Sequence, residues 1–305
     1  MNNPPLRYLV TGFLFAMLWA SASAAGKIGL LSAEGLVLFS VRFIAAGILL
    51  LGYSVFIQQD RFPRQNEWKH LLIFGSLNTT LYLGIFIISL EEVTAGITAI
   101  ALALNPLLIS TITAAWLKRP VAKLEWISIL IGIAGVTLAS YPLLQNSYAT
   151  LRGLLLLATC MVAYSFGAVY YASVDWKLSR TAVNGWQVLI GGILLIPPTL
   201  LLHAKPNHFD LRFWLSVGWL VIPVSIGAVQ LWLYLLKSDA VKASLWLFLC
   251  PIFGLAYASV LLDEPFTLFT VWGTLLVLIA LLLGQRTLLK KVIASWPIGY
   301  PAGDG

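Results

Sequence analysis

The sequence has few charged residues. Only 10% of its 305 residues are charged, whereas 60% are hydrophobic, and a soluble domain carries about 25% charged residues. Such a chain could not cover a water-exposed surface without leaving large apolar patches. The composition therefore excludes an ordinary soluble globular protein and indicates a chain whose solvent is the lipid bilayer.

Cysteine and histidine are scarce as well. Cys160 and Cys250 lie in separate apolar runs, which is typical of packing residues and not of a disulfide framework. The three histidines, His70, His203 and His208, lie in loops or at predicted helix ends. The sequence has no metal-ligand spacing, no nucleophile elbow and no phosphate-binding glycine loop. We therefore predict no metal, no cofactor and no enzymatic activity.

Acidic residues are absent from the interior of every apolar run. All twelve aspartates and glutamates lie in predicted loops or at helix ends. Carriers of organic cations usually place a carboxylate within the membrane, where it binds the cation or a proton. The sequence therefore disfavours that mechanism and favours a neutral, zwitterionic or anionic solute.

Ten apolar runs make up most of the chain. Each has about 20 residues, the length that an α-helix needs to span about 30 Å of hydrocarbon. The runs cover residues 9–31, 36–57, 69–89, 94–117, 124–143, 151–173, 183–202, 213–236, 241–262 and 268–288. We predict an all-α membrane protein of ten transmembrane helices, followed by a cytoplasmic tail over residues 291–305.

A shift of 145 residues superimposes the second half of the sequence on the first. Gly47–Leu50, for example, falls on Gly192–Leu195, which has the same four residues. Each half holds five predicted helices. Because five is odd, the second half must enter the membrane from the opposite side, as in many transporters. We therefore predict two inverted five-helix repeats, over residues 1–145 and 146–290.

Lysines and arginines determine the predicted orientation. With a cytoplasmic N-terminus, fourteen of the nineteen fall in cytoplasmic segments and four in external ones, while Arg42 lies within a helix. An excess of Lys and Arg marks the cytoplasmic side of a membrane protein. We predict a multi-pass protein of the inner (plasma) membrane with both termini cytoplasmic. The net charge of +7 then reflects orientation and not a nucleic-acid partner.

Several of these features together resemble the EamA-type permeases of the drug/metabolite transporter superfamily. The matching residues, within about residues 6–288, are the Trp19 region, Arg42-Phe43, Thr94-Ala95-Gly96, Asn105-Pro106, Gly132 to Gly135 and Leu262-Asp263-Glu264-Pro265. The resemblance implies inverted repeats in which helices 1, 3, 4, 6, 8 and 9 surround a central cavity and helices 2, 5, 7 and 10 lie outside. It also implies export of amino acids or related metabolites. The chain departs from the family where Lys118-Arg119 replaces a Glu after helix 4, so any role of that carboxylate rests on Glu264.

Seven side chains in the helices that the resemblance places around the cavity are candidates for contacting a substrate. They are Trp19, Asn78, Tyr82, Asn105, Tyr164, Gln230 and Trp246. Asn78 and Tyr82 are four residues apart on one face of a helix. An amide facing lipid would be costly, so Asn78 should face either a cavity or another helix. Trp19 and Tyr164 are matched by the 145-residue shift, and each would either pack in the core or stack on a solute.

Four further residues are candidates for structural or gating roles: Arg42, Pro106, Pro251 and Glu264. Arg42 either pairs with a substrate carboxylate or is a structural residue that snorkels or bonds helix-end carbonyls, and we favour the structural interpretation. Pro106 and Pro251 are matched by the same shift, and each removes a backbone hydrogen bond and bends its helix. These bends either expose carbonyls to a cavity or only shape the packing.

The sequence therefore predicts a secondary transporter, an exporter of amino acids or related small metabolites that works by alternating access. Efflux of other organic solutes or drugs is the alternative. A lipid-modifying membrane enzyme and a structural subunit without a solute path are less favoured. The expected partners are a small-molecule substrate and the bilayer, and the oligomeric state stays open, a monomer included.

Overall fold

Ten helical spans account for the described part of the chain in the computed structural model, which covers residues 4–93, 95–144, 149–202, 205–262, 267–286 and 289–290. In the first half, the spans are α1 (Pro4–Leu30); α2 and η1 (Gly35–Gly52, Tyr53–Ile57); α3, η2 and α4 (Gln65–Gly75, Ser76–Gly84, Ile85–Ser89); α5 and α6 (Ala95–Ala103, Asn105–Trp116); and α7 (Lys123–Ala139). The short α8 (Tyr141–Leu144) follows. The first half thus contains five spans, as the sequence predicts.

The second half repeats this order. Its spans are α9 (Leu151–Ser173); α10 (Arg180–Leu201); α11, η3 and α12 (Leu211–Trp219, Leu220–Ala228, Val229–Ser238); α13, η4 and α14 (Ala240–Ser244, Leu245–Phe248, Leu249–Leu262); and α15 (Leu268–Gly284). Eight of the ten spans are long and apolar enough to cross a membrane, and α7 and α15 are shorter, with 17 residues each. The predicted all-α architecture of ten helices is confirmed.

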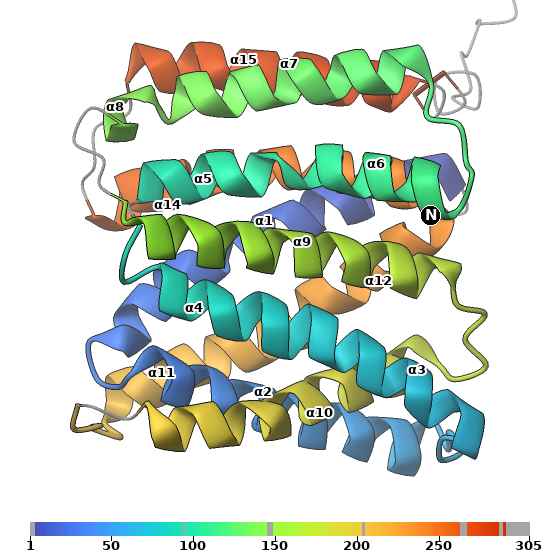
Figure 1. Ribbon diagram of the computed structural model, residues 1–305, viewed down its shortest axis with the longest axis vertical. Helices are drawn as coiled ribbons and strands as arrows, with labels where there is room; N and C mark the ends of the chain where they lie inside the picture. The colour runs from blue at the N-terminus through green and yellow to red at the C-terminus, as the bar shows by residue number, and fades with distance from the viewer. Residues whose placement is uncertain are drawn as a thin grey trace, which may run out of the picture.

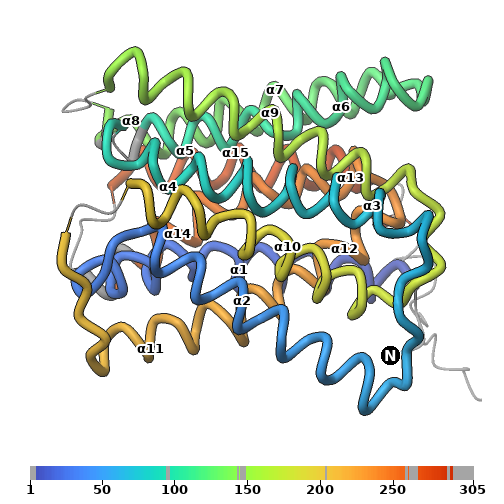
Figure 2. Tube along the Cα trace, turned by 60° about the horizontal axis from the view of Figure 1, so that its bottom comes forward, coloured from blue at the N-terminus to red at the C-terminus, as the bar shows by residue number. Residues whose placement is uncertain are grey.

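The spans run side by side, and their ends meet at two opposite faces of the molecule (Figure 1). The pair α7 and α15 forms one end of the long axis, and α2 and α10 lie near the other end (Figure 1). Figure 2 shows α2 running beside α10. The remaining spans, numbers 1, 3, 4, 6, 8 and 9, lie between these two pairs. The family resemblance places the same six spans in the inner set and the other four outside.

Both outer pairs pack through small residues that the 145-residue shift relates to one another. In the pair α2 and α10, a Cβ on Gly47 would lie 2.6 Å from the Cβ of Leu189, and a Cβ on Gly192 would lie 3.1 Å from the amide nitrogen of Ile44. Adding 145 to positions 47 and 44 gives 192 and 189. The two contacts are therefore the same contact made twice, as a pseudo-twofold relation between the halves requires.

The pair α7 and α15 also makes one contact twice, at positions related by the 145-residue shift. A Cβ on Gly273 would lie 2.5 Å from the carbonyl oxygen of Gly135. At the related positions, Ser128 Oγ donates to the carbonyl oxygen of Ala280 at 2.5 Å. Small residues let helix backbones approach closely enough for van der Waals packing and interhelical hydrogen bonds, which drive helix association in lipid.

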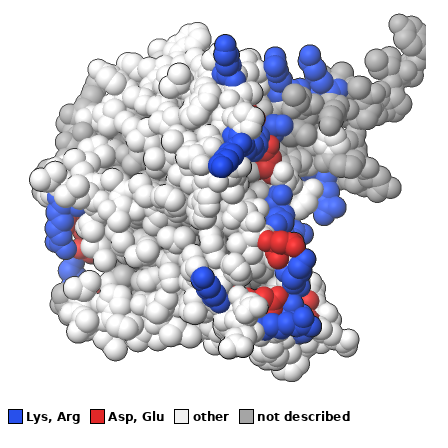
Figure 3. All heavy atoms as spheres, turned by 45° about the vertical axis from the view of Figure 1, so that its right-hand side comes forward, with Lys and Arg blue, Asp and Glu red and all other residues white. Residues whose placement is uncertain are grey.

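Charged side chains gather at the two ends of the spans, with a broad uncharged surface between them (Figure 3). One end, here called the basic face, carries most of the cations, among them Arg7, Arg61, Arg119, Arg180 and Lys237. The other end, here called the mixed-charge face, carries acids and bases together, among them Glu34, Glu92, Arg152 and Asp210. The uncharged surface fits the hydrocarbon layer of a bilayer.

The packing of α7 on α15 makes a testable prediction. In Gly135→Ala, the new Cβ would lie 2.9 Å from both the Gly273 carbonyl oxygen and the Val277 nitrogen, so the two backbones must separate. We expect a loss of about 1–3 kcal/mol of stability, the usual cost of overpacking, seen as a lower midpoint of thermal unfolding in detergent. Gly218→Ala is the control, because a Cβ there meets nothing within 4 Å; equal midpoints for the two variants would contradict the packing.

Candidate functional site

A column of aromatic rings lies in the interior of the bundle, where spans 1, 3, 6 and 8 meet. The ring centroids of Tyr82 and Tyr164 are 4.5 Å apart, and Tyr164 is stacked on Trp232 at 5.9 Å. Trp232 is stacked on Phe15 at 4.9 Å, and Trp19 lies 5.9 Å from Phe15. Aromatic pairs contribute about 0.5–1.5 kcal/mol beyond their buried area. These five residues are called the aromatic column below.

The polar atoms of two rings in the column lack partners. The Tyr164 hydroxyl and the Trp232 indole nitrogen are buried, and neither makes a hydrogen bond to any residue that the structure describes. Most buried polar atoms in proteins do have a partner. Two donors in the middle of the bundle are therefore available to a polar group of a solute that stacks on the rings.

A chain of hydrogen bonds, here called the buried polar network, connects spans 2, 7 and 8 beside the column. Arg42 Nε donates to Ser225 Oγ at 2.8 Å, and the Asn184 amide donates to the carbonyl oxygen of Ser225 at 3.0 Å. The Gln187 amide donates to Asn184 Oδ1 at 3.0 Å. All four side chains are buried. Each gives another polar group in the network a hydrogen-bond partner, which lipid could not provide.

The same network continues into span 3. Gln187 Oε1 accepts hydrogen bonds from Asn78 at 3.2 Å and from Thr79 at 2.7 Å. Gln187 and Arg42 are related by the 145-residue shift, so each half contributes one long polar side chain from its second span. Asn78, a predicted substrate residue, thus makes an interhelical hydrogen bond, which is one of the two roles that the sequence allowed.

Arg42 carries a buried charge without an acidic partner. Its exposed fraction is 2%, and its guanidinium carbon lies 5.2 Å and 5.0 Å from the ring centroids of Phe39 and Phe43. None of the five ion pairs among the described residues includes Arg42. The buried polar network that includes Arg42 reaches Asn78 and Thr79 of span 3, the span that also carries Tyr82 of the aromatic column. A buried charge is costly unless it is paired, so this guanidinium is suited to an anionic group next to the column.

Three other predicted substrate residues lie in different surroundings. Asn105 is buried; its amide donates to Met161 Sδ at 3.3 Å, and its Oδ1 accepts from Ser165 Oγ at 3.3 Å. Trp246 packs against Gly12, where a Cβ would lie 2.0 Å from the indole ring. Gln230 is half-buried, and its side-chain nitrogen has no hydrogen-bond partner within the described ranges. None of the three stacks in the aromatic column.

The two predicted proline bends coincide with interruptions of the helices. Span 4 is broken at Leu104, between α5 and α6, just before Pro106. In span 9 a 3₁₀ turn, η4, directly precedes α14, which contains Pro251. Glu264, the fourth predicted gating residue, lies outside the described residues.

Sequence reasoning missed two features of the site. The first is a π-helical segment in the middle of span 3 and of span 8, η2 and η3, at positions that the 145-residue shift relates to within one residue. Such segments often occur at functional sites, and Pro223 within η3 was the one local signal. The second feature is the pair Phe15 and Trp232. Phe15 could have been found from its position four residues before Trp19, on the same helical face.

The mixed-charge face is closed by contacts between the two halves. Glu92 forms an ion pair with Arg152 at 2.9 Å and accepts a hydrogen bond from the Thr150 hydroxyl. Val93 forms a β-bridge with Ala149. A second set of contacts joins the loops, in which Lys205 N donates to Glu34 Oε1 at 2.7 Å, Glu34 N donates to Asn207 Oδ1 at 2.8 Å and His208 N donates to Ser32 O at 2.7 Å.

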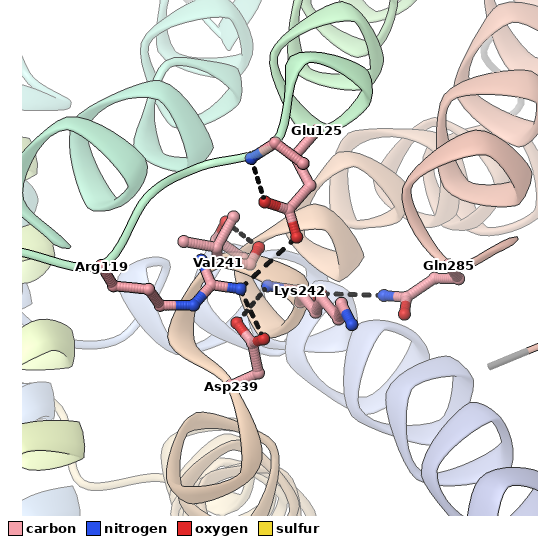
Figure 4. Close-up of polar contacts among 8 residues, drawn as sticks. Arg119, Glu125, Asp239, Val241, Lys242 and Gln285 are labelled. Atoms are coloured by element: carbon pink, nitrogen blue, oxygen red, sulfur yellow. Dashed lines mark hydrogen bonds and ion pairs between the residues drawn. The ribbon is translucent and has the colours of Figure 1, made fainter. Parts of the chain in front are cut away.

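The basic face has a cluster of polar contacts, one of which, between Arg119 and Asp239, joins the two halves. Arg119 Nη2 donates to Asp239 at 2.7 Å and to Glu125 at 3.4 Å, and the Gln285 amide donates to the Lys242 carbonyl oxygen at 2.9 Å (Figure 4). Beside this cluster, a cavity of about 370 Å³ opens among the ends of spans 6, 7 and 8. The described residues therefore join the two halves by several contacts at the mixed-charge face, and they form a cavity at the basic face.

Comparison with known proteins is consistent with this geometry. A model of the EamA-like transporter family matches residues 6–141 and 151–284. An uncharacterized transporter of Synechocystis sp. is 24% identical over 307 residues, covering 95% of this chain and 93% of the relative. The uncharacterized inner membrane transporter YedA of Escherichia coli K12 is 27% identical over 235 residues, 74% of each chain. A crystal structure that is 18% identical superimposes with a TM-score of 0.77 over 95% of this chain and 99% of the other.

The buried polar network makes a second prediction. Gln187→Met keeps the volume of the side chain but removes the acceptor of Asn78 and Thr79 and the donor to Asn184. A buried polar group left without its partner costs about 1–3 kcal/mol, so we expect a clear fall in the thermal unfolding midpoint in detergent. The control is Gln65→Met at the exposed start of α3, which should stay within about 0.5 kcal/mol of the wild type. Equal effects would mean that the network does not stabilise the fold.

Proposed function

We propose that this chain, which belongs to the EamA-like transporter family, exports amino acids or closely related small metabolites. Family membership makes the chain a multi-pass membrane transporter and not an enzyme, so catalysis on lipids is excluded. Its partners are then a small-molecule substrate and the bilayer. The substrate class, the direction and the mechanism are the proposal.

The observation that supports the substrate class is the buried Arg42 guanidinium beside the aromatic column. An amino acid has a carboxylate, which would satisfy this unpaired charge, and a side chain that can lie against Tyr82, Tyr164, Trp232 and Trp19. The absence of acids from the interior of the apolar runs disfavours an organic cation, which would need a carboxylate in the membrane. An amino acid with an apolar or aromatic side chain fits these surroundings best.

Alternating access is supported by the different contacts at the two faces. The mixed-charge face is closed by Glu92, Arg152 and the loop contacts, while the basic face has a cavity. In inverted repeats the two halves can exchange conformations, which would open the first face and close the second around a site near the middle. We propose that the two halves, residues 1–145 and 146–290, move relative to each other in this way.

We further propose that the basic face is cytoplasmic, with both chain termini on that side of the inner membrane. The excess of lysine and arginine there supports this orientation. The relative YedA is named as an inner membrane transporter. A solute would then enter from the cytoplasm through the open face, which suits an exporter.

Transport assays test the substrate class. Proteoliposomes that contain the purified chain, loaded in turn with each of a panel of labelled amino acids, should show saturable efflux and counterflow for at least one of them. Arg42→Gln should lower this flux about tenfold or more, because the lost contact to a charged group is worth about 1.5–3 kcal/mol. Arg42→Lys should keep part of the flux, since it keeps the charge.

A matched arginine serves as the control. Arg61 lies on the surface of the basic face in an ion pair with Glu67, so Arg61→Gln should leave the flux unchanged. An unaltered elution profile in size-exclusion chromatography would show that the Arg42 variants remain folded. Absence of saturable flux for every amino acid would disprove the substrate class, and full flux in Arg42→Gln would disprove the role of the guanidinium.

A further inference from the structure

The cavity on the basic face, here called the basic vestibule, combines aromatic rings with cations. Its wall includes Tyr171, Trp176, Arg180, Tyr234, Lys237 and Ser238, and its volume is about 370 Å³. Rings beside cations are typical of sites for an anionic group attached to an apolar body.

Arg180 and Lys237 line the vestibule, Arg7 lies beside it against Tyr234, and none of the three forms an ion pair with a described acid. The guanidinium carbons of Arg180 and Arg7 lie 5.1 Å and 5.4 Å from the ring centroid of Tyr234. Lys237 Nζ donates to the carbonyl oxygen of Val174 at 2.7 Å. Arg7, Arg180 and Lys237 are all exposed.

One carboxylate lies nearby but is already engaged. Asp175 forms an ion pair with Lys177. The hydrogen bond from Lys177, together with its charge and that of Lys237, holds the pKa of Asp175 below its ordinary value. Asp175 therefore stays ionised while bound to Lys177, and the vestibule keeps an excess of positive charge.

Two helices, α9 and α12, contribute side chains both to the vestibule and to the aromatic column. Tyr171 follows Tyr164 by seven residues on α9, which places it on nearly the same face about 10 Å along the helix axis. On α12, Lys237 follows Trp232 by five residues. The two helices that present rings to the column thus also line the vestibule.

The inverted repeat shows what the vestibule lacks. Shifting by 145 residues relates Lys237 to Glu92 and Arg7 to Arg152. On the mixed-charge face, Glu92 and Arg152 form an ion pair that ties the two halves together. On the basic face, the related residues are both cations and repel each other. Arg119 and Asp239 join the two halves elsewhere on the basic face. At the position related to the Glu92–Arg152 pair, however, a counter-charge would have to be added.

We propose that the carboxylate of the transported solute binds in the basic vestibule as the counter-charge of Arg7, Arg180 and Lys237. Its binding takes the place of the missing acid and allows the basic face to close, as Glu92 does on the mixed-charge face. Arginine side chains bind carboxylates through paired hydrogen bonds, and the rings of Trp176 and Tyr234 contact the apolar part of the solute. This inference rests on the proposed function for the identity of the solute, but its charge requirement is tested separately.

The first test introduces an acidic residue into the chain at the vestibule. A cysteine reporter is introduced by Ser238→Cys, with Cys160→Ala and Cys250→Ala to remove other thiols, and its rate of maleimide labelling is measured in phosphatidylcholine nanodiscs. Adding Lys237→Glu should slow labelling about twofold to fivefold, the effect of one solvated ion pair on an equilibrium, because Glu at this position pairs with Arg7. Arg7→Glu, which pairs with Lys237, should do the same.

Two controls separate closure from a general disturbance. Lys237→Gln removes the repulsion without supplying an acid and should not slow labelling to the same extent. Adding Arg7→Gln to Lys237→Glu removes the partner and should restore the rate. If neither charge reversal slows labelling, or if Arg7→Gln fails to restore the rate, the proposed closure is wrong.

The second test supplies the charge from outside. Sodium benzoate, which carries a carboxylate on an aromatic ring, should slow labelling of the reporter chain with native Arg7 and Lys237, whereas neutral benzamide should not. Absence of a benzoate effect, or an equal effect of benzamide, overturns the proposal. Slowing by phosphatidylglycerol nanodiscs alone, without benzoate protection, also overturns it and assigns the vestibule to a lipid headgroup.

Amino acid flux through the wild-type chain is measured in parallel. If charge reversal and benzoate both slow labelling but no amino acid is carried, the proposed substrate fails while the vestibule stands. If amino acids are carried and neither treatment slows labelling, the vestibule fails while the transport function stands.

Discussion

The hydrocarbon interior of a bilayer offers no hydrogen-bond partner, and every polar group that enters it must find one within the protein. This constraint explains why the described chain is helical throughout its spans. It also explains why Arg42, Ser225, Asn184, Gln187, Asn78 and Thr79 meet in one buried network. The network joins spans of both halves and lies beside the aromatic column, so the groups that stabilise the interior also border the candidate site.

The inverted repeat gives the two opposite faces the same arrangement of helices. The faces differ in the charges that they carry at related positions. Glycine and other small residues at related positions hold α2 against α10 and α7 against α15 by duplicated contacts. At the faces, related positions carry different charges. Glu92 and Arg152 form an ion pair between the halves at one face, whereas the related residues at the other face, Lys237 and Arg7, are both cations. On that face the halves are joined by Arg119 and Asp239 instead.

Much of the fold could be predicted from the sequence because a run of about 20 apolar residues is enough to identify a membrane span. The ten apolar runs and the 145-residue offset gave the number of helices, their inverted order and the proline bends at Pro106 and Pro251. The site was harder to predict because its contacts join distant residues. Arg42 meets Ser225, 183 positions away, and no local pattern indicates that pairing.

The relation between Asn78 and Tyr82 shows a second limit. Their spacing places them on one face of a regular α-helix, but span 3 is π-helical there, and the two side chains contact different spans. Asn78 binds Gln187 on α10, whereas Tyr82 packs on Tyr164 of α9. Propensity and periodicity do not indicate a π-helical segment, because it depends on how the surrounding helices pack.

The central claim is that the two halves are oppositely oriented in the bilayer, and a pair of related arginines tests it most directly. Arg7 and Arg152 occupy the same position in the two halves and are both exposed. Arg7→Cys and Arg152→Cys would each be made in a chain without other cysteines and treated with a membrane-impermeant maleimide in spheroplasts. We expect labelling at position 152 in intact spheroplasts and at position 7 only after lysis. Labelling of both positions from the same side would contradict the inverted architecture.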